Sequence, residues 1–228
     1  MVFLNREEAG RRLAQELGRL EGQNLAGQNL ESQNLVVFAL PRGGVPVAAP
    51  IAAAFDAPLD LALVRKIGAP LQPELAMGAV ADAAKPVVVR NEDVIALLGV
   101  SAARFDDACQ RECAELARRR ALYLGDRPRA QAKGRIALVV DDGVATGATT
   151  RAALRAVRAQ EPARLILAVP VASTEALDAL RTEADDIVCL EAHGWFGGVG
   201  GYYEDFHQVT DSEVIALLDR YGPRAARG

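Results

Sequence analysis

Two adjacent carboxylates stand at the end of an apolar run, directly before a turn of small residues. Ile136–Val140 is apolar throughout, and Asp141 and Asp142 follow it. Soon after them, Ala145–Thr149 offers backbone N–H groups and two threonine hydroxyls. Unpaired amides at a helix N-terminus bind phosphate when no bulky side chain blocks the approach. Carboxylates repel phosphate, but they accept hydrogen bonds from vicinal hydroxyls or hold a divalent cation. The segment therefore predicts a site for a sugar phosphate.

Two other phosphate-binding loops are excluded. The chain has no Gly-Lys-Ser/Thr of a Walker A loop, and the segment is not the Gly-x-Gly-x-x-Gly of dinucleotide binding. An ordinary strand–turn–helix is a poor explanation as well, because two acids and two threonines at this spacing serve no packing purpose.

The elements that position these residues alternate between apolar runs and helical patterns. Apolar strands separated by helices indicate a parallel sheet covered on both faces, so the predicted fold class is α/β. Ligands of such sheets bind beyond the C-terminal strand ends, where the motif falls. Strands are predicted at 35–40, 59–64, 136–140, 165–169 and 187–190, helices at 6–20, 45–55, 91–98, 101–123, 150–159, 174–182 and 210–221, a hairpin from 79–81 and 86–89, and a loop at 67–78.

Composition limits the classes of protein. With 228 residues, 50% hydrophobic and 25% charged, the chain is expected to form one domain with its own core. A formal charge of −4 argues against duplex-DNA binding. Three cysteines make no disulfide framework, and two histidines cannot assemble a zinc site. No apolar stretch is long enough for a membrane span, and the acidic N-terminus is unlike a signal peptide, so a soluble, cytoplasmic protein is expected.

The run Leu138–Thr150 resembles the phosphoribosyl-pyrophosphate (PRPP) signature of type I phosphoribosyltransferases. The resemblance implies that Asp141 and Asp142 hold the ribose hydroxyls and that Ala145–Thr149 wraps the 5′-phosphate. The residues that it assigns to PRPP binding in this segment are Asp141, Asp142, Gly143, Ala145, Thr146, Gly147, Ala148 and Thr149.

Leu40–Gly44, after the first core strand, resembles the pyrophosphate loop of the same family, in which a non-proline peptide is often cis. Gly43 and Gly44 permit the close approach that such a loop needs, and Arg42 adds charge. Taken alone, the segment would equally fit a Gly-Gly turn at a strand end.

Val64–Gly68 resembles the Arg-Lys strand ending of adenine and orotate phosphoribosyltransferases, which implies that Arg65 and Lys66 meet pyrophosphate. The alternative interpretation is that these two cations at a strand end are simply solvated. The loop at 67–78 is predicted to be a lid, and Glu74 within it is the candidate acid facing the acceptor, with an exposed loop carboxylate as the alternative.

Aromatic residues after the last predicted strand are candidates for an acceptor pocket, either by stacking on the acceptor or by merely covering the sheet edge. They are His193, Trp195 and Phe196. The segment Tyr202–Val214 resembles a bacterial branch of largely uncharacterised phosphoribosyltransferase-domain proteins, over nearly the whole chain except the Gln-Asn-Leu repeat at 22–34. That repeat is interpreted as a duplicated polar loop, with a binding surface as the alternative.

The resemblance implies transfer of a 5-phosphoribosyl group from PRPP to a nitrogenous acceptor such as a nucleobase, with release of pyrophosphate. Mg²⁺ is the implied cofactor, held mainly by PRPP oxygens, with Asp141 and Asp142 as further candidates. Ala145 stands where 6-oxopurine relatives carry an acid, which argues against that acceptor. The alternatives are a regulatory protein that binds PRPP or a nucleotide without turnover, and an accessory subunit that uses the helix at 102–123.

The expected organisation is a single domain over 1–228. Within it, 67–134 forms the lid loop, hairpin and helical insertion, and 191–228 forms a C-terminal hood and tail. The expected partners are PRPP and a small-molecule acceptor, with no nucleic acid or membrane, and a homodimer is the assembly considered.

Overall fold

The computed structural model describes residues 2–21, 34–70, 72–82 and 86–223. Residues 22–33, which hold most of the Gln-Asn-Leu repeat, lie outside the described part, so both interpretations of the repeat stay predictions.

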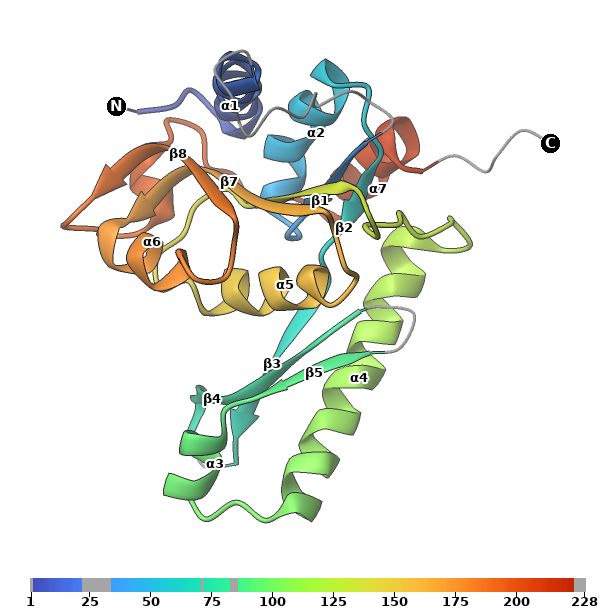
Figure 1. The fold of residues 1–228 in the computed structure, drawn as a ribbon, viewed down its shortest axis with the longest axis vertical. Coiled ribbons are helices and arrows are strands. Elements are labelled where there is room, and N and C mark those ends of the chain that lie inside the picture. Colours follow the sequence, from blue (N-terminus) through green and yellow to red (C-terminus); the bar gives the residue numbers. More distant parts are fainter. Residues whose placement is uncertain (1, 22–33, 71, 83–85, 224–228) are drawn as a thin grey trace.

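A five-stranded parallel sheet forms the centre of the molecule, in the order β2-β1-β6-β7-β8 (Figure 1). Its strands are apolar because both faces are covered, as the sequence predicts. β1 and β6 pair in register from Leu35↔Ile136 to Ala39↔Val140, so the segments that follow them leave the same edge of the sheet. The bounds are β1 (Leu35–Ala39), β2 (Leu59–Leu61), β6 (Ile136–Val140), β7 (Arg164–Ser173) and β8 (Asp186–His193).

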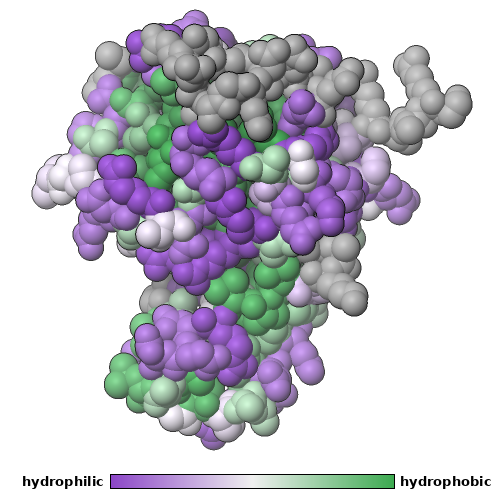
Figure 2. All heavy atoms as spheres, in the orientation of Figure 1, coloured by the Kyte–Doolittle hydropathy of each residue, from purple (hydrophilic) through white to green (hydrophobic). Residues whose placement is uncertain are grey.

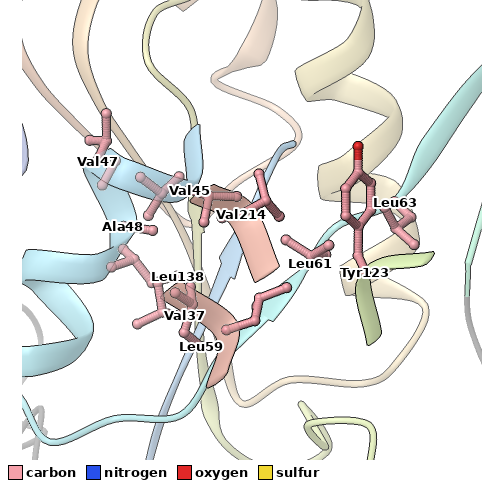
Figure 3. Packing of buried hydrophobic residues seen from close by; sticks show 14 of the residues in the cluster. Val37, Val45, Val47, Ala48, Leu59, Leu61, Leu63, Tyr123, Leu138 and Val214 are labelled. Atoms are coloured by element: carbon pink, nitrogen blue, oxygen red, sulfur yellow. The ribbon is translucent and has the colours of Figure 1, made fainter. Parts of the chain in front are cut away.

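Helices cover the two faces of this sheet. One face carries α1 (Arg6–Glu21), α2 (Gly44–Ala54) and α7 (Asp211–Tyr221), and the other carries α5 (Ala148–Arg158) and α6 (Thr174–Leu180). Alternate strand residues point to opposite faces. Val37 and Leu138 therefore pack with Val45 of α2 and Val214 of α7 (Figure 3), whereas Val139 packs in the second core cluster with the α5 and α6 side chains.

An arm over residues 64–124 projects from the sheet below α5 (Figure 1). It consists of an antiparallel sheet of β3 (Val64–Ala69), β4 (Gln72–Ala81) and β5 (Val87–Arg90), followed by α3 (Glu92–Leu97) and α4 (Ala102–Leu124). Ile67, Met77 and Phe105 form its buried interior. Figure 2 shows hydrophobic surface on the arm beneath the hydrophilic face over α5, and Val88 and Leu97 are among the exposed hydrophobic residues.

Helix starts follow the predicted capping signals. The Asn5 side chain accepts a hydrogen bond from the Glu8 N–H at 2.9 Å, and Thr210 with Glu213 forms a capping box at α7. Asn91 and Ser101 cap α3 and α4. The predictions of these helices are confirmed to within two residues at each end.

Three strand predictions need correction. The strand predicted at 59–64 ends at Leu61, and Val64 begins β3 in the second sheet. The loop predicted at 67–78 is wrong, since β3 and β4 occupy this range as paired strands. Its glycines signalled a loop, but a β-bulge at Gly68 and a close approach at Gly78 accommodate them within strands, and a Cβ at Gly78 would lie 2.3 Å from the Val89 oxygen.

The third correction concerns β7, which is longer than predicted. It continues past Pro170 to Ser173, because pairing with β8 resumes at Val171 and holds to the strand end.

In the described part of the chain, no helix has the length and apolar character needed to cross a membrane.

Candidate functional site

The turn after β6 is fastened to the end of β7. The Val144 N–H donates to the Val171 oxygen at 2.9 Å, and the Ser173 N–H donates to the Val144 oxygen at 2.9 Å. The Ser173 hydroxyl donates to the Ala145 oxygen at 2.7 Å. Gly147 then takes a φ of 75° and starts α5, a conformation that favours glycine. The first N–H groups of an α-helix have no intrahelical partner, so the start of α5 offers donors of the kind that an anion site requires.

The loop after β1 packs directly against the acid pair. A Cβ at Gly43 would lie 2.0 Å from Asp142 Oδ2, and one at Gly44 would lie 2.7 Å from the Val140 oxygen. A side chain at either position would prevent this approach. Close packing therefore explains why both positions are glycine, which the sequence alone did not show. The peptide between Pro41 and Arg42 is cis. The structure therefore brings the two predicted motifs into contact at one edge of the sheet.

The two acids have different surroundings. Burial and the neighbouring Asp142 carboxylate raise the pKa of Asp141 well above its ordinary value. The Asp142 N–H donates to Asp141 Oδ1 at 2.9 Å, which holds the first carboxylate in place. Asp142 instead faces a cation: its Oδ2 lies 2.8 Å from Arg6 Nε.

Arg6 is a site residue that sequence reasoning missed. Its side chain is 8% exposed, and its Nη1 donates to the His207 oxygen at 2.9 Å. Its guanidinium carbon lies 3.8 Å from the centre of the Phe206 ring. The only sequence signal was an arginine directly after the N-cap Asn5, a place where an acid suits the helix dipole better.

Arg6 and Tyr203 join the acid pair to the strap, the name used here for residues 203–209, which follow the short helix η1 (Val199–Tyr202). The Tyr203 hydroxyl donates to the Asp142 backbone oxygen at 2.6 Å. Burial raises the pKa of Tyr203, so this hydroxyl keeps its proton at neutral pH. The strap is therefore bonded directly to the main chain of Asp142 and, through Arg6, to its side chain.

A cavity of about 300 Å³ opens between Asp142, the loop after β1, the strap and Arg6 of α1. Its lining includes Arg6, Arg42, Gly43, Asp142, Phe206 and His207. The concave space is thus bounded by residues from four segments that are distant in sequence.

Asp211 and Tyr123 are two further residues that sequence reasoning did not single out. Arg42 Nη1 lies 3.5 Å from Asp211 Oδ1, and the Tyr123 hydroxyl donates to the same oxygen at 2.6 Å. In the sequence Asp211 is simply an acid in the first turn of α7, where the helix dipole explains it. The contact connects the loop after β1 to the end of α4.

Arg65 and Lys66 lie in β3 of the arm sheet. Arg65 Nε pairs with Glu112 Oε2 of α4 at 2.7 Å, and Lys66 is exposed. The predicted role of Arg65 at pyrophosphate would require this ion pair to open. Glu74 falls in β4, and its side chain is outside the described part of the structure.

The three aromatic candidates for the acceptor pocket separate into two groups. The rings of His193 and Phe196 lie against Tyr202, with centroid distances of 4.6 Å and 5.1 Å. Trp195 is 87% exposed. His193 is paired in the strand register with Ser173, whose hydroxyl donates to the Ala145 oxygen, so the stacked group adjoins the turn after β6.

Among the described residues, no group of three or more His, Cys, Asp or Glu side chains is arranged to hold a metal ion. The adjacent Asp141 and Asp142 carboxylates are oxygen donors of the kind that Mg²⁺ accepts, but two of them do not complete an octahedral site. The residues therefore fit a magnesium ion that its ligand supplies with most of its oxygens.

The family of the chain follows from comparison of its sequence with protein-family models. The model described as the phosphoribosyl transferase domain matches residues 8–207. This range contains both candidate loops and the strap up to His207. The chain belongs to the phosphoribosyl transferase family.

Two relatives are similar over nearly the whole chain. "Putative phosphoribosyl transferase Rv0571c" of Mycobacterium tuberculosis is 42% identical over 219 residues, which are 96% of this chain and 47% of that protein. The crystal structure of TT1426 from Thermus thermophilus is 40% identical, with a TM-score of 0.82, covering 98% of this chain and 100% of that one. The chain thus spans about half the length of the curated relatives that it matches.

Proposed function

We propose that this protein transfers the 5-phosphoribosyl group of PRPP to a nitrogen atom of a small acceptor, such as a nucleobase, and releases pyrophosphate. The observation that carries the proposal is the contact between Gly43 and Asp142. It joins a loop suited to pyrophosphate to an acid suited to ribose hydroxyls, and both line one cavity. The turn suited to phosphate follows the acid pair directly in the chain.

Each part of the ligand has a matching part of the site. The 5′-phosphate accepts from the amides and hydroxyls of Ala145–Thr149 at the start of α5. The ribose hydroxyls donate to Asp141 and Asp142. Pyrophosphate lies along Arg42, Gly43 and Gly44, where the loop offers a positive charge and backbone N–H groups.

The transfer exchanges one bond at C1 of the ribose for another. The bond from C1 to the pyrophosphate oxygen breaks, and that oxygen keeps the electron pair. The acceptor nitrogen supplies the electron pair of the new bond and then gives up a proton. Positive charge develops on the ribose and negative charge on the leaving group, so Arg42 stabilises the departure of pyrophosphate.

Magnesium fits this site as a partner of the ligand. Bound mainly to PRPP oxygens, and with Asp141 or Asp142 as further oxygen donors, it would neutralise part of the charge on pyrophosphate. Arg42 has to turn from Asp211 toward the ligand. The contact is 3.5 Å long and partly exposed, so its loss costs little.

The test is calorimetric titration of PRPP into the protein with and without Mg²⁺, followed by a panel of nucleobases with pyrophosphate release as the readout. Saturable binding, with release for one base, establishes the transferase and identifies its acceptor. Binding without release for any base favours the regulatory alternative. Absence of PRPP binding in both conditions overturns the proposal.

A further inference from the structure

Arg6 occupies a position that an ordinary surface arginine does not. Its side chain and that of Asp142 are 8% and 15% exposed, and the bond between them is 2.8 Å. A buried ion pair is costly to form unless further hydrogen bonds satisfy the two groups. Arg6 meets this condition through its second bond, to the His207 oxygen, and through the Phe206 ring beneath its guanidinium.

The other side of the Asp142 carboxylate rests on the loop after β1. Asp142 Oδ2, the atom that Arg6 contacts, lies where a side chain at position 43 would otherwise stand. Arg6 thus keeps the Asp142 carboxylate in contact with Gly43, and its Nη1 donates to the backbone oxygen of His207 in the strap. The Arg6 side chain therefore connects Asp142 to the strap, and Asp142 in turn rests on the loop after β1.

We propose that Arg6 is a positioning residue that orients the Asp142 carboxylate to accept a ribose hydroxyl. The proposal rests on the proposed function, because it assigns Asp142 to the sugar. Arg6 lines the cavity, but its guanidinium is bonded to Asp142 and to the His207 oxygen, so it acts on the ligand through Asp142. It removes the freedom of the carboxylate to rotate away, and it compensates the negative charge of Asp142 that a phosphorylated sugar must approach.

This role affects one part of the ligand and leaves another unchanged. The 5′-phosphate binds at Ala145–Thr149, which Arg6 does not contact. Loss of Arg6 should therefore reduce the contribution of a ribose hydroxyl to affinity, while the phosphate contribution remains. A merely structural role would weaken every phosphorylated ligand alike.

The experiment compares ribose 5-phosphate with its 2-deoxy and 3-deoxy analogues by calorimetry. In the wild-type protein, removal of the hydroxyl that donates a hydrogen bond to Asp142 should weaken binding by about tenfold or more, as expected for a hydrogen bond to a charged group. In Arg6→Gln, removal of the same hydroxyl should weaken binding by only about twofold, because the Asp142 carboxylate is no longer held in place.

Two variants serve as controls. Arg12→Gln, on the same helix, removes a guanidinium that pairs with Glu8 and lies over the Phe3 ring. This variant should distinguish ribose 5-phosphate from its deoxy analogues as well as the wild type does. Arg6→Lys keeps the charge but lacks the two-donor fork that spans Asp142 and His207, so it should restore only part of the discrimination.

The outcomes separate the two proposals. Undiminished discrimination in Arg6→Gln, or full restoration by Arg6→Lys, overturns the positioning role and leaves the proposed function standing. If the wild-type protein binds PRPP but none of the sugar phosphates, or binds them without discrimination, this inference is overturned and the proposed function stands. If it does not bind PRPP either, both fail. Thermal melting of each variant verifies that it is folded under the conditions of the titration.

Discussion

At the scale of single residues, the candidate site depends on charges that neutralise one another within a small space. Asp142 faces Arg6, Arg42 faces Asp211, and the strap residue His207 lies between Asp205 and Glu213. Each of these pairs joins a residue that could contact a ligand to a residue that holds the site together. Substitutions here should therefore show which of the two residues affects ligand affinity and which affects the stability of the fold.

Replacing Asp142 by Asn should abolish PRPP binding with little change in the fold. The amide lacks the negative charge, and its NH₂ group replaces one of the two acceptor oxygens, so either Arg6 Nε or a ligand hydroxyl meets a donor in place of an acceptor. Calorimetry measures the binding, and circular dichroism follows the fold. Asp178→Asn, which removes an exposed acid paired with Arg181, is the matched control and should bind PRPP normally. Normal PRPP affinity in Asp142→Asn would refute the assignment of this acid.

The pKa of His207 should lie above the ordinary value for histidine. Hydrogen bonds to Glu213 and Asp205 raise its pKa, and Glu213→Gln should lower it toward the usual value, as NMR of the ring can measure. Glutamine can still complete the capping box with Thr210, so this variant removes the charge and keeps the helix start.

The same shift has a consequence for stability. A histidine whose pKa is raised in the folded state stabilises the protein below the ordinary histidine pKa, and this stabilisation is lost as pH rises through the raised value. Melting curves of the wild type and of His207→Gln should therefore diverge at acidic pH and converge at alkaline pH. A constant difference across this range would contradict the assignment.

At the scale of elements, the arm and the parallel sheet depend on different contacts. The arm interior is formed by residues of β3, β4 and α4, including Ile67, Met77 and Phe105. Arg65 and Glu112 connect β3 to α4 at its surface. The strand pairing within the parallel sheet includes no strand of the arm.

Phe105→Ala should loosen the arm by about 3–5 kcal/mol, the usual cost of removing a buried phenylalanine side chain. Phe105 is 1% exposed, and its ring also lies under the Arg90 guanidinium. Hydrogen exchange should increase in β3, β4 and α4, while β1 and β6 remain protected. Leu97→Ala, at an exposed position of α3, is the control. Equal acceleration in β1 and β6 would show instead that the arm and the sheet unfold as one unit.

At the scale of the whole molecule, ligand binding should stabilise the folded chain because the cavity exists only there. The cavity walls come from Arg6 of α1, the loop after β1, Asp142 after β6 and the strap, which are far apart in sequence. An unfolded chain cannot assemble such a site. PRPP should therefore bind the native state alone.

At a concentration of about 100 times its Kd, PRPP should stabilise the protein by about 2.7 kcal/mol. For a chain of this size, that corresponds to a rise in Tm of roughly 5–10 °C. Differential scanning calorimetry with and without PRPP measures the shift, and Asp142→Asn should show none. A rise of the same size in that variant would mean that PRPP stabilises the protein from another site.

The sequence by itself determined the alternation of strands and helices and the place of the acid pair. Both are local properties: an apolar run fixes a buried strand, and the residues after it must lie at the sheet edge. Caps at Asn5, Ser101 and Thr210 are equally local, which explains why the helix bounds were predicted so closely.

Only the tertiary structure decided which distant residues meet. Arg6 and Asp142 are 136 positions apart, and no pattern along the chain indicates that they pair. The strands at 67–78 were missed for a related reason, since the antiparallel pairing of β3 with β4 and a bulge override the loop signals of their glycines. Local sequence restricts the conformation of neighbouring residues, whereas the packing of whole elements selects the contacts that complete the site.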